Sequence, residues 1–148
     1  MDNIHDFILF HKNVRGMTST ERLDELLLEL EGQRWDIVLL NETMRNIVQE
    51  TWITHNGHMF CGSGHDSHTH GVAILLHKKW RPFVQQFVPV TERVAYIDIR
   101  RRRLRLQLIA AYFPHGGYND KQVQQVYDTI TAITQEATKN KQHVIIGA

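Results

Sequence analysis

A short apolar run between two acids, Asp36 and Glu42, constrains the fold of this chain more than any other feature. Residues 37–40 are all aliphatic and the first two are β-branched. A continuous apolar run of this length is typical of a strand buried on both faces of an α/β sheet. Glu42 then follows the carboxyl end of the strand, where ligands and catalytic groups collect in open α/β sheets. The alternative is that Glu42 only solvates a loop or caps the next helix.

The residues before this strand predict a strand and a helix. Residues 7–10 form an apolar run, which indicates a buried strand that delivers Asn13 to a loop. Thr18 and Glu21 have the spacing of a capping box, with Thr18 as the cap of the helix. Leucines then recur at helical spacing as far as Gly32 and predict an amphipathic helix. The order strand, helix, strand predicts a parallel, right-handed crossover.

Five further strands are predicted between Glu42 and the second helix. They are short or aliphatic runs bounded by polar residues, prolines or glycines, and they lie at residues 52–53, 71–77, 83–88, 93–99 and 103–113, with a packing plug as the alternative for residues 52–53. The last two are separated only by a basic turn, which favours antiparallel pairing. In residues 103–108 leucine alternates with arginine or glutamine, so one face of that strand is expected in the core.

The C-terminal part of the chain predicts a second helix and a last strand. Asn119 or Asp120 is the expected cap of this helix. Its apolar stripe consists of Val123, Val126, Tyr127, Ile130 and Ile133. Residues 143–146 are then expected to form a buried strand.

Composition sets broad limits on the class of protein. A chain of 148 residues with 42% hydrophobic and 22% charged residues is typical of one globular domain. The net charge of +1 excludes a generally basic nucleic-acid coat but leaves room for a local basic patch. Cys61 is the single cysteine, so no internal disulfide forms, and a reducing intracellular compartment, the nucleus included, is consistent with this. Every apolar run is too short to span a bilayer.

Five pieces of sequence, taken in order, resemble the endonuclease/exonuclease/phosphatase superfamily. They are Asn13-Val14-Arg15-Gly16, residues 36–42, Gly71-Val72-Ala73-Ile74-Leu75-Leu76, Tyr112-Phe113-Pro114-His115 and Val144-Ile145-Ile146-Gly147. The chain is most similar to the apurinic-like endonuclease domain of RTE-type non-LTR retrotransposons and to the related craniofacial development protein 2-like proteins. Residues 75–80 and 112–120 carry this closer similarity.

The resemblance implies a fold and a domain division. It implies an α/β fold, namely the N-terminal portion of a four-layer sandwich with two mixed sheets face to face and helices outside. On this interpretation residues 1–148 are a single truncated domain that lacks its C-terminal half.

The resemblance also implies a site. Glu42 matches the family's metal-ligating Glu, and the metal is Mg²⁺, with Mn²⁺ as an alternative. Asn13 matches the Asn that hydrogen-bonds around metal and phosphate. Tyr112 matches the Tyr that contacts the phosphate, and the alternative for Tyr112 is a core aromatic residue. Arg15 departs from the family pattern, because repair enzymes often have an Asp at that position. The implied activity is magnesium-dependent nicking of DNA.

The family places further catalytic groups after the strand that ends in Gly147. These are an Asp-x-Asn, a second acidic ligand and an Asp-His pair, and residues 1–148 contain none of them at recognisable spacing. Hydrolysis of a phosphodiester needs both charge neutralisation and an activated water. We therefore expect no appreciable nuclease activity from residues 1–148 alone.

Two other functions are compatible with the sequence. The chain could be a non-catalytic interaction module or the product of a decayed gene. It could also be a phosphoesterase of the same superfamily that acts on phosphoinositide or nucleotide substrates.

Several polar clusters have a functional and a structural interpretation. His65, His68 and His70 could bind zinc, but they lack a partner pair at motif spacing, so a solvated loop is favoured. The arginines at 100–103 and 105 could contact DNA phosphates, but a solvated hairpin tip and a charged sheet edge are favoured. Trp80 is expected to pack in the core, Asp98 to be structural, and Cys61 to be a small buried hydrophobe.

Overall fold

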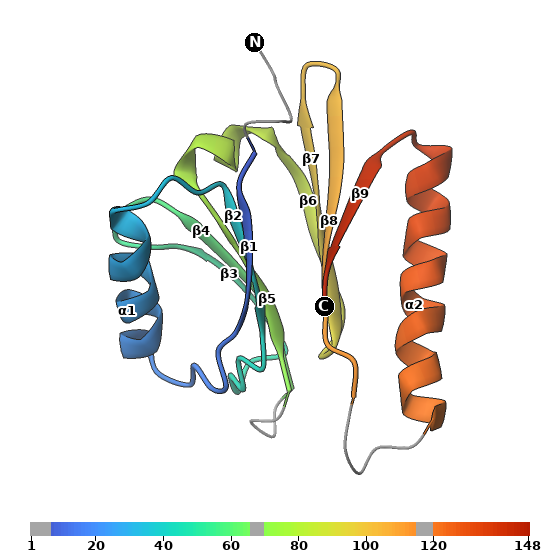
Figure 1. The fold of residues 1–148 in the computed structure, drawn as a ribbon, viewed down its shortest axis with the longest axis horizontal. Helices are drawn as coiled ribbons and strands as arrows, with labels where there is room; N and C mark the ends of the chain where they lie inside the picture. The colour runs from blue at the N-terminus through green and yellow to red at the C-terminus, as the bar shows by residue number, and fades with distance from the viewer. Residues whose placement is uncertain (1–6, 66–69, 115–119) are drawn as a thin grey trace.

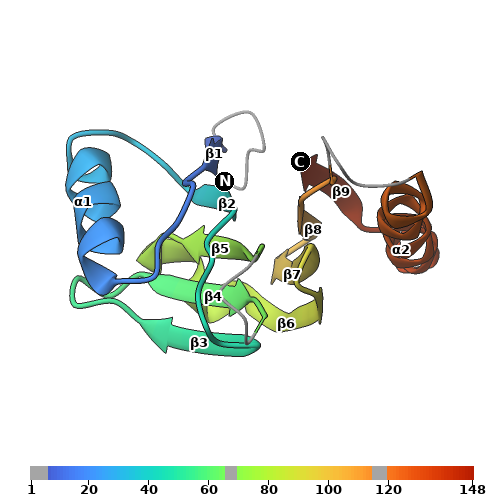
Figure 2. The same ribbon diagram turned by 90° about the horizontal axis from the view of Figure 1, so that it is seen from below.

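The two sheets of this protein pack face to face, and each carries one helix on its outer surface (Figure 1). We describe a computed structural model in which residues 7–65, 70–114 and 120–148 are placed. Helix α1 (Thr20–Glu31) covers the first sheet and α2 (Asp120–Lys139) covers the second, as the view from below also shows (Figure 2). The predicted fold class, a four-layer α/β sandwich, is confirmed.

The first sheet has five strands in the order β1-β2-β5-β4-β3. Strands β1 and β2, which precede and follow α1 in the sequence, pair in parallel, so the predicted parallel pairing is confirmed. The other pairs in this sheet are antiparallel. A 3₁₀ helix, η2 (Lys78–Phe83), follows this sheet along the chain. The strand bounds are β1 Leu9–Asn13, β2 Ile37–Asn41, β3 Gln49–Ile53, β4 Met59–Ser63 and β5 Val72–Leu76.

The second sheet has four strands in the order β6-β7-β8-β9. Strands β7 and β8 form the predicted antiparallel hairpin, and β8 pairs in parallel with β9 after the connection through α2. No helix of the described residues has both the length and the apolar character needed to span a bilayer. The strand bounds are β6 Val84–Thr91, β7 Val94–Arg101, β8 Leu104–Ala111 and β9 His143–Gly147.

Strand β2 is continuously apolar because both of its faces are covered. Ile37 and Leu39 belong to the core between the two sheets. Val38 and Leu40 belong to the second core, under the leucines of α1. All four side chains are at most 1% exposed. Burying each contributes about 1.5–3 kcal/mol, which fixes the position of the residues that follow the strand.

The predicted capping box of α1 is wrong. The helix begins at Thr20 with Ser19 as the N-cap residue, and no side chain caps it. Thr18 precedes the helix and lies in a loop that is held against the segment after β2. The Met17 side chain is buried, and its amide donates to the Thr43 carbonyl at 2.7 Å.

The predictions of buried first and last strands are also wrong. Strands β1 and β9 each have one neighbour, so each forms an edge of its sheet. Phe10 in β1 and Ile146 in β9 are 37% and 46% exposed. An apolar run alone does not distinguish an edge strand from a central one.

The predicted apolar stripe of α2 is confirmed at Val126 and Ile130, which are buried, but not at Tyr127. Tyr127 is mostly exposed, and its ring packs on Phe113 with a centroid distance of 4.7 Å. Gln107, expected on the outer face of its strand, is buried because α2 covers that side of the sheet. The cap predicted at Asn119 lies outside the described residues.

Candidate active site

Several loops meet at one end of the sandwich, at the bottom of Figure 1. Here β1 and β2 end, β5 begins, β6 turns into β7, and β8 ends. Backbone hydrogen bonds tie these segments into one network. The bonds are Val14 N to Asn41 O (3.0 Å), Gly16 N to Glu42 O (2.7 Å), Thr43 N to Gly71 O (3.1 Å), Met44 N to His70 O (2.7 Å), Gly71 N to Glu92 O (3.0 Å) and Tyr112 N to Arg93 O (2.8 Å).

The network connects the segments that carry the three predicted site residues. Asn13 directly precedes Val14, whose amide is a donor in the network. The Glu42 carbonyl is an acceptor, and the Tyr112 amide is a donor. Residues far apart in sequence therefore lie on backbone segments that hydrogen bonds connect to one another. The structure places all three at the same end of the fold.

The backbone at this end adopts unusual conformations. Glu42, Met44 and His70 have φ angles of 55°, 53° and 59°, in the left-handed region. Such a conformation costs about 1–2 kcal/mol for a non-glycine residue. Strained backbone of this kind concentrates at functional sites, where the surrounding structure holds it in place. The network of hydrogen bonds supplies that constraint here.

Gly71 allows the start of β5 to approach the end of β2. Its φ angle is +100°, which favours glycine. A Cβ atom at this position would collide with the Thr43 hydroxyl and lie 3.2 Å from the Met44 amide nitrogen. The glycine thus maintains the two hydrogen bonds that hold residues 43 and 44 against the β5 segment.

Glu42 and Asn41 place two kinds of oxygen at the end of β2. Glu42 is half-buried, and its carboxylate has no hydrogen-bond or ion-pair partner among the residues that the structure describes. Asn41 is 4% exposed, and its Oδ1 accepts no hydrogen bond from the described part of the chain. A buried acceptor without a donor costs about 1–3 kcal/mol. Sequence reasoning missed Asn41, although its position directly before Glu42 is a usable signal.

Carboxylate and amide oxygens suit a hard divalent cation such as Mg²⁺ or Mn²⁺. Within the described residues, no group of three or more His, Cys, Asp or Glu side chains could hold a metal ion. Mg²⁺ is often bound through one or two carboxylates and retains several waters. The residues at the end of β2 therefore fit an ion of this type that keeps much of its hydration.

Asn13 is exposed at the end of β1, opposite Asn41 in the strand register. Its Oδ1 accepts a hydrogen bond from the Arg15 amide at 3.2 Å, which shapes the turn after the strand. Arg15 is exposed, and its side chain supplies no carboxylate to this end of the fold.

Tyr112 is buried, with 8% of its surface exposed, and its ring centroid lies 6.2 Å from that of His70. The Nε2 atom of His70 lies 3.5 Å from Nη2 of Arg93. Burial and the Arg93 guanidinium hold the pKa of His70 below its ordinary value, against the charges of Glu92 and Glu42. His70 therefore favours the neutral form and lies within the electrostatic reach of Glu42.

The histidine-rich loop divides into residues with different environments. His65 is exposed, which agrees with a solvated loop, but His70 is half-buried among site residues, so that interpretation is wrong for His70. His68, like His115 after Tyr112, lies outside the described residues. Neither Arg93 nor the role of His70 was predicted, because only the fold brings the start of β7 beside the end of β8.

Three solved structures are similar to this chain. The endonuclease domain of TRAS1, a telomere-specific non-LTR retrotransposon, has a TM-score of 0.61 and 17% identity, with 95% of this chain and 57% of that domain covered. An AP endonuclease from Leishmania major has a TM-score of 0.60 and 12% identity, with 88% and 47% covered. A 3′-5′ exonuclease from Neisseria meningitidis has a TM-score of 0.60 and 16% identity, with 93% and 55% covered.

These likenesses establish the class of fold. The chain has the fold of the endonuclease/exonuclease/phosphatase type, and it spans about half the length of the solved structures that it matches. No protein-family model matches the sequence, and no curated protein matches it.

Proposed function

We propose that this chain supplies part of the active site of a magnesium-dependent phosphodiesterase that nicks DNA and is related to retrotransposon endonucleases. The observation that carries the proposal is the end of β2. There the Glu42 carboxylate follows a buried amide oxygen of Asn41, and neither group accepts a hydrogen bond from the described residues. The nuclease-type fold and the sequence resemblance support DNA as the substrate.

The described residues have distinct roles in this proposal. Glu42 holds the metal ion, with Asn41 as a neighbouring oxygen ligand. When bound, the ion polarises the scissile phosphate and offsets its negative charge. The Asn13 amide and the Tyr112 hydroxyl donate hydrogen bonds to phosphate oxygens and stabilise charge that develops during the reaction. Neutral His70 adds a further hydrogen-bonding group beside Tyr112.

Metal-dependent binding of DNA tests this arrangement on the chain itself. We expect Mg²⁺ to tighten the binding of a fluorescent duplex with hydrolysis-resistant phosphorothioate linkages by about tenfold, or about 1.4 kcal/mol. Glu42→Gln should abolish the Mg²⁺-dependent increment, because the metal ligand is lost. Fluorescence anisotropy with and without Mg²⁺ measures it.

A matched variant controls for the loss of one negative charge. Glu21 is an exposed acid in the first turn of α1. Glu21→Gln should keep the full Mg²⁺-dependent increment. If Glu42→Gln also keeps it, or if the wild-type chain shows none, the proposed metal site is wrong.

The hydrolytic step is tested on the full-length gene product that contains residues 1–148. Supercoiled plasmid should be converted to nicked circles in Mg²⁺, and Glu42→Gln should reduce this conversion by at least about 10²-fold, the scale of a lost electrostatic stabiliser. Tyr112→Phe should reduce it with little effect on Mg²⁺ affinity, because Tyr112 contacts phosphate and not metal.

A further inference from the structure

The β7–β8 hairpin extends beyond both neighbouring strands. The first residue of β6 pairs with Ile99, and the first residue of β9 pairs with Leu106. Residues 100–105 therefore pair only with each other, and they project from the end of the sandwich opposite Glu42 (Figure 1). Five of these six residues are arginines. We call residues 100–105 the basic hairpin tip.

Strands β7 and β8 are the two central strands of their sheet, but residues 100–105 extend beyond β6 and β9, so the edges of this part of the hairpin are unpaired. The expected solvated hairpin tip is confirmed at Arg100, Arg102 and Arg103, which are exposed. The arrangement of these arginines is locally unfavourable. Arg100 lies directly opposite Arg105, and like charges in this position repel. Arg102 has a φ of 54°, in a turn where Asn or Gly is preferred.

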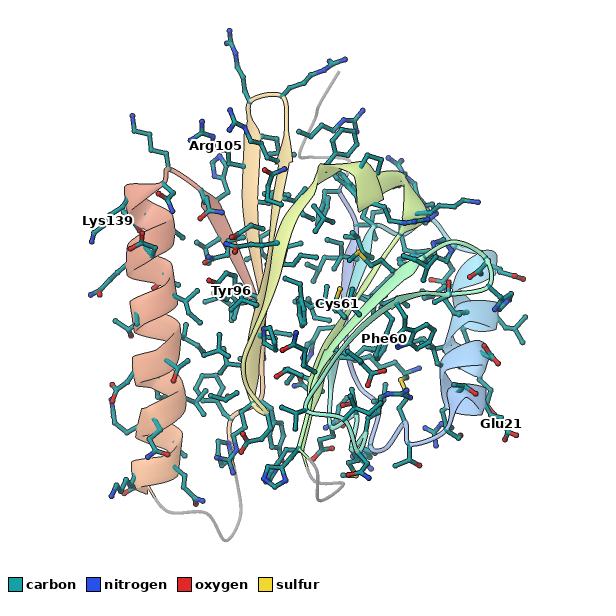
Figure 3. All side chains as sticks on the ribbon, turned by 180° about the vertical axis from the view of Figure 1, so that it is seen from behind. Glu21, Phe60, Cys61, Tyr96, Arg105 and Lys139 are labelled. Atoms are coloured by element: carbon teal, nitrogen blue, oxygen red, sulfur yellow. The ribbon has the colours of Figure 1, made fainter. Side chains whose placement is uncertain are left out.

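The basic hairpin tip contacts a second basic segment. The guanidinium carbon of Arg101 lies 5.7 Å from the ring centroid of Trp80 and 5.0 Å from that of Phe83. Both aromatic residues belong to η2, which also presents Lys78, Lys79 and Arg81 at the surface. Figure 3 shows Arg105 at this end of the hairpin.

Two buried acids of the described residues lie near this surface. The Asp36 side chain accepts from Trp80 and forms an ion pair with Lys79, which offsets that one positive charge. Asp98 is buried too, and its oxygens accept from Gln86 at 2.6 Å and Gln142 at 2.8 Å. Among the described residues, the charged side chains of residues 100–105 and of η2 are all positive, although the whole chain has a net charge of only +1.

We propose that the basic hairpin tip and η2 form a second nucleic-acid site, which binds the phosphate backbone of duplex DNA without reading its sequence. Guanidinium groups make bidentate bonds to phosphate oxygens, and releasing counterions from DNA drives such binding. A linear polyanion also offsets the repulsion between closely spaced arginines. The site goes beyond the proposed catalytic function, because it lies at the other end of the fold and needs no metal ion.

The test measures binding of a mixed-sequence fluorescent duplex in EDTA, so that the candidate metal site is silent. The double variant Arg100→Gln/Arg103→Gln removes two exposed charges. We expect its affinity at low salt to fall by at least tenfold. The slope of log K against log salt should decrease by about two, which is close to one unit per lost phosphate contact.

Two controls separate a defined site from general electrostatics. Arg100→Lys/Arg103→Lys keeps the charge and should stay within about threefold of wild type, because nonspecific affinity follows charge. Lys12→Gln/Lys121→Gln removes the same charge from exposed positions on β1 and α2 and should also stay within about threefold, because neither position belongs to the proposed surface. The proposal is overturned if Arg100→Gln/Arg103→Gln binds like wild type. It is also overturned if Lys12→Gln/Lys121→Gln loses as much affinity as Arg100→Gln/Arg103→Gln does. Circular dichroism confirms that each variant is folded.

Discussion

Two acids lie at the two ends of the same buried strand and have opposite environments. Asp36 precedes β2, and its side chain is 3% exposed with both oxygens engaged. Its Oδ2 accepts from the Ile8 amide at 2.6 Å, and its Oδ1 accepts from Trp80 Nε1 at 2.7 Å and Lys79 Nζ at 2.8 Å. Glu42 follows β2, and the described residues offer its carboxylate no partner.

The comparison shows that partners, more than residue type, separate a structural acid from a candidate ligand. Burial raises the pKa of Asp36, but the hydrogen bonds from Lys79, Ile8 and Trp80 outweigh it, so the pKa lies below its ordinary value. Three donors already surround that carboxylate, and one of them is the Lys79 ammonium, which offsets its charge. Glu42 instead lies on strained backbone and follows Asn41, whose buried Oδ1 has no donor among the described residues, which is the condition of a site prepared for a ligand.

The largest expected effect is the difference in the free energy of unfolding between variants of the two acids. Asp36→Ala should lower the free energy of unfolding by about 4 kcal/mol, because buried donors lose their acceptor. Glu42→Ala should change it by less than about 0.5 kcal/mol. Urea denaturation of both variants measures this, and similar losses for the two would erase the distinction.

Acid should destabilise the Asp36 end through His58. This ring packs against Trp35 and His77, with centroid distances of 4.8 Å and 4.6 Å, and its Nδ1 accepts from the Lys78 amide at 3.0 Å. Burial, followed by the charges of His77, Lys78 and His55, lowers its pKa from 6.5 to about 4. The neutral ring is thus favoured in the folded state, and the unfolded chain takes up the proton first.

The stability that neutral His58 contributes is present above pH 6.5 and is lost as the pH falls towards 4. The loss should reach about 3 kcal/mol over this interval. His58→Gln should flatten the pH dependence measured by urea denaturation, whereas His55→Gln, which removes only the smallest of the charges that act on His58, should alter it much less. An unaltered curve for His58→Gln would show that other groups cause the loss.

Gly71→Ala should disturb the Glu42 end. The added Cβ meets the Thr43 hydroxyl and the φ angle of +100° disfavours alanine, so we expect a loss of about 2 kcal/mol. Gly32→Ala is the matched control, because a Cβ there meets nothing within 4 Å. Thermal unfolding compares the two, and equal stabilities would mean that the loop is not tightly held.

The smallest effect is a gain. Glu42→Gly relieves the left-handed strain and should raise the free energy of unfolding by about 0.5 kcal/mol, while it removes Mg²⁺-dependent DNA binding. Denaturation and anisotropy on one preparation give both values. A destabilised variant would instead indicate that the Glu42 side chain has a structural role.

Much of the fold could be predicted from local patterns. The run at 37–40 and the leucines before it indicated β2 and α1, and the basic turn at 100–103 indicated the β7–β8 hairpin. Edge positions could not be predicted, since the exposure of Phe10 and Ile146 depends on which strands pair.

The candidate site was predicted only in part. Glu42, Asn13 and Tyr112 follow or end strands in recognisable motifs, and the structure places them at one end. Asn41, His70 and Arg93 depend on tertiary contacts and on left-handed backbone, which no periodic pattern encodes.

The most direct test of the contrast between the two acids is a titration of the ¹⁵N-labelled chain with Mn²⁺, followed by paramagnetic broadening of amide signals. We predict broadening around Asn41, Glu42 and Thr43 and at Gly71 and Tyr112, none around Asp36, and loss of the effect in Glu42→Gln. Broadening centred on Asp36, or broadening that persists unchanged in Glu42→Gln, would contradict the account.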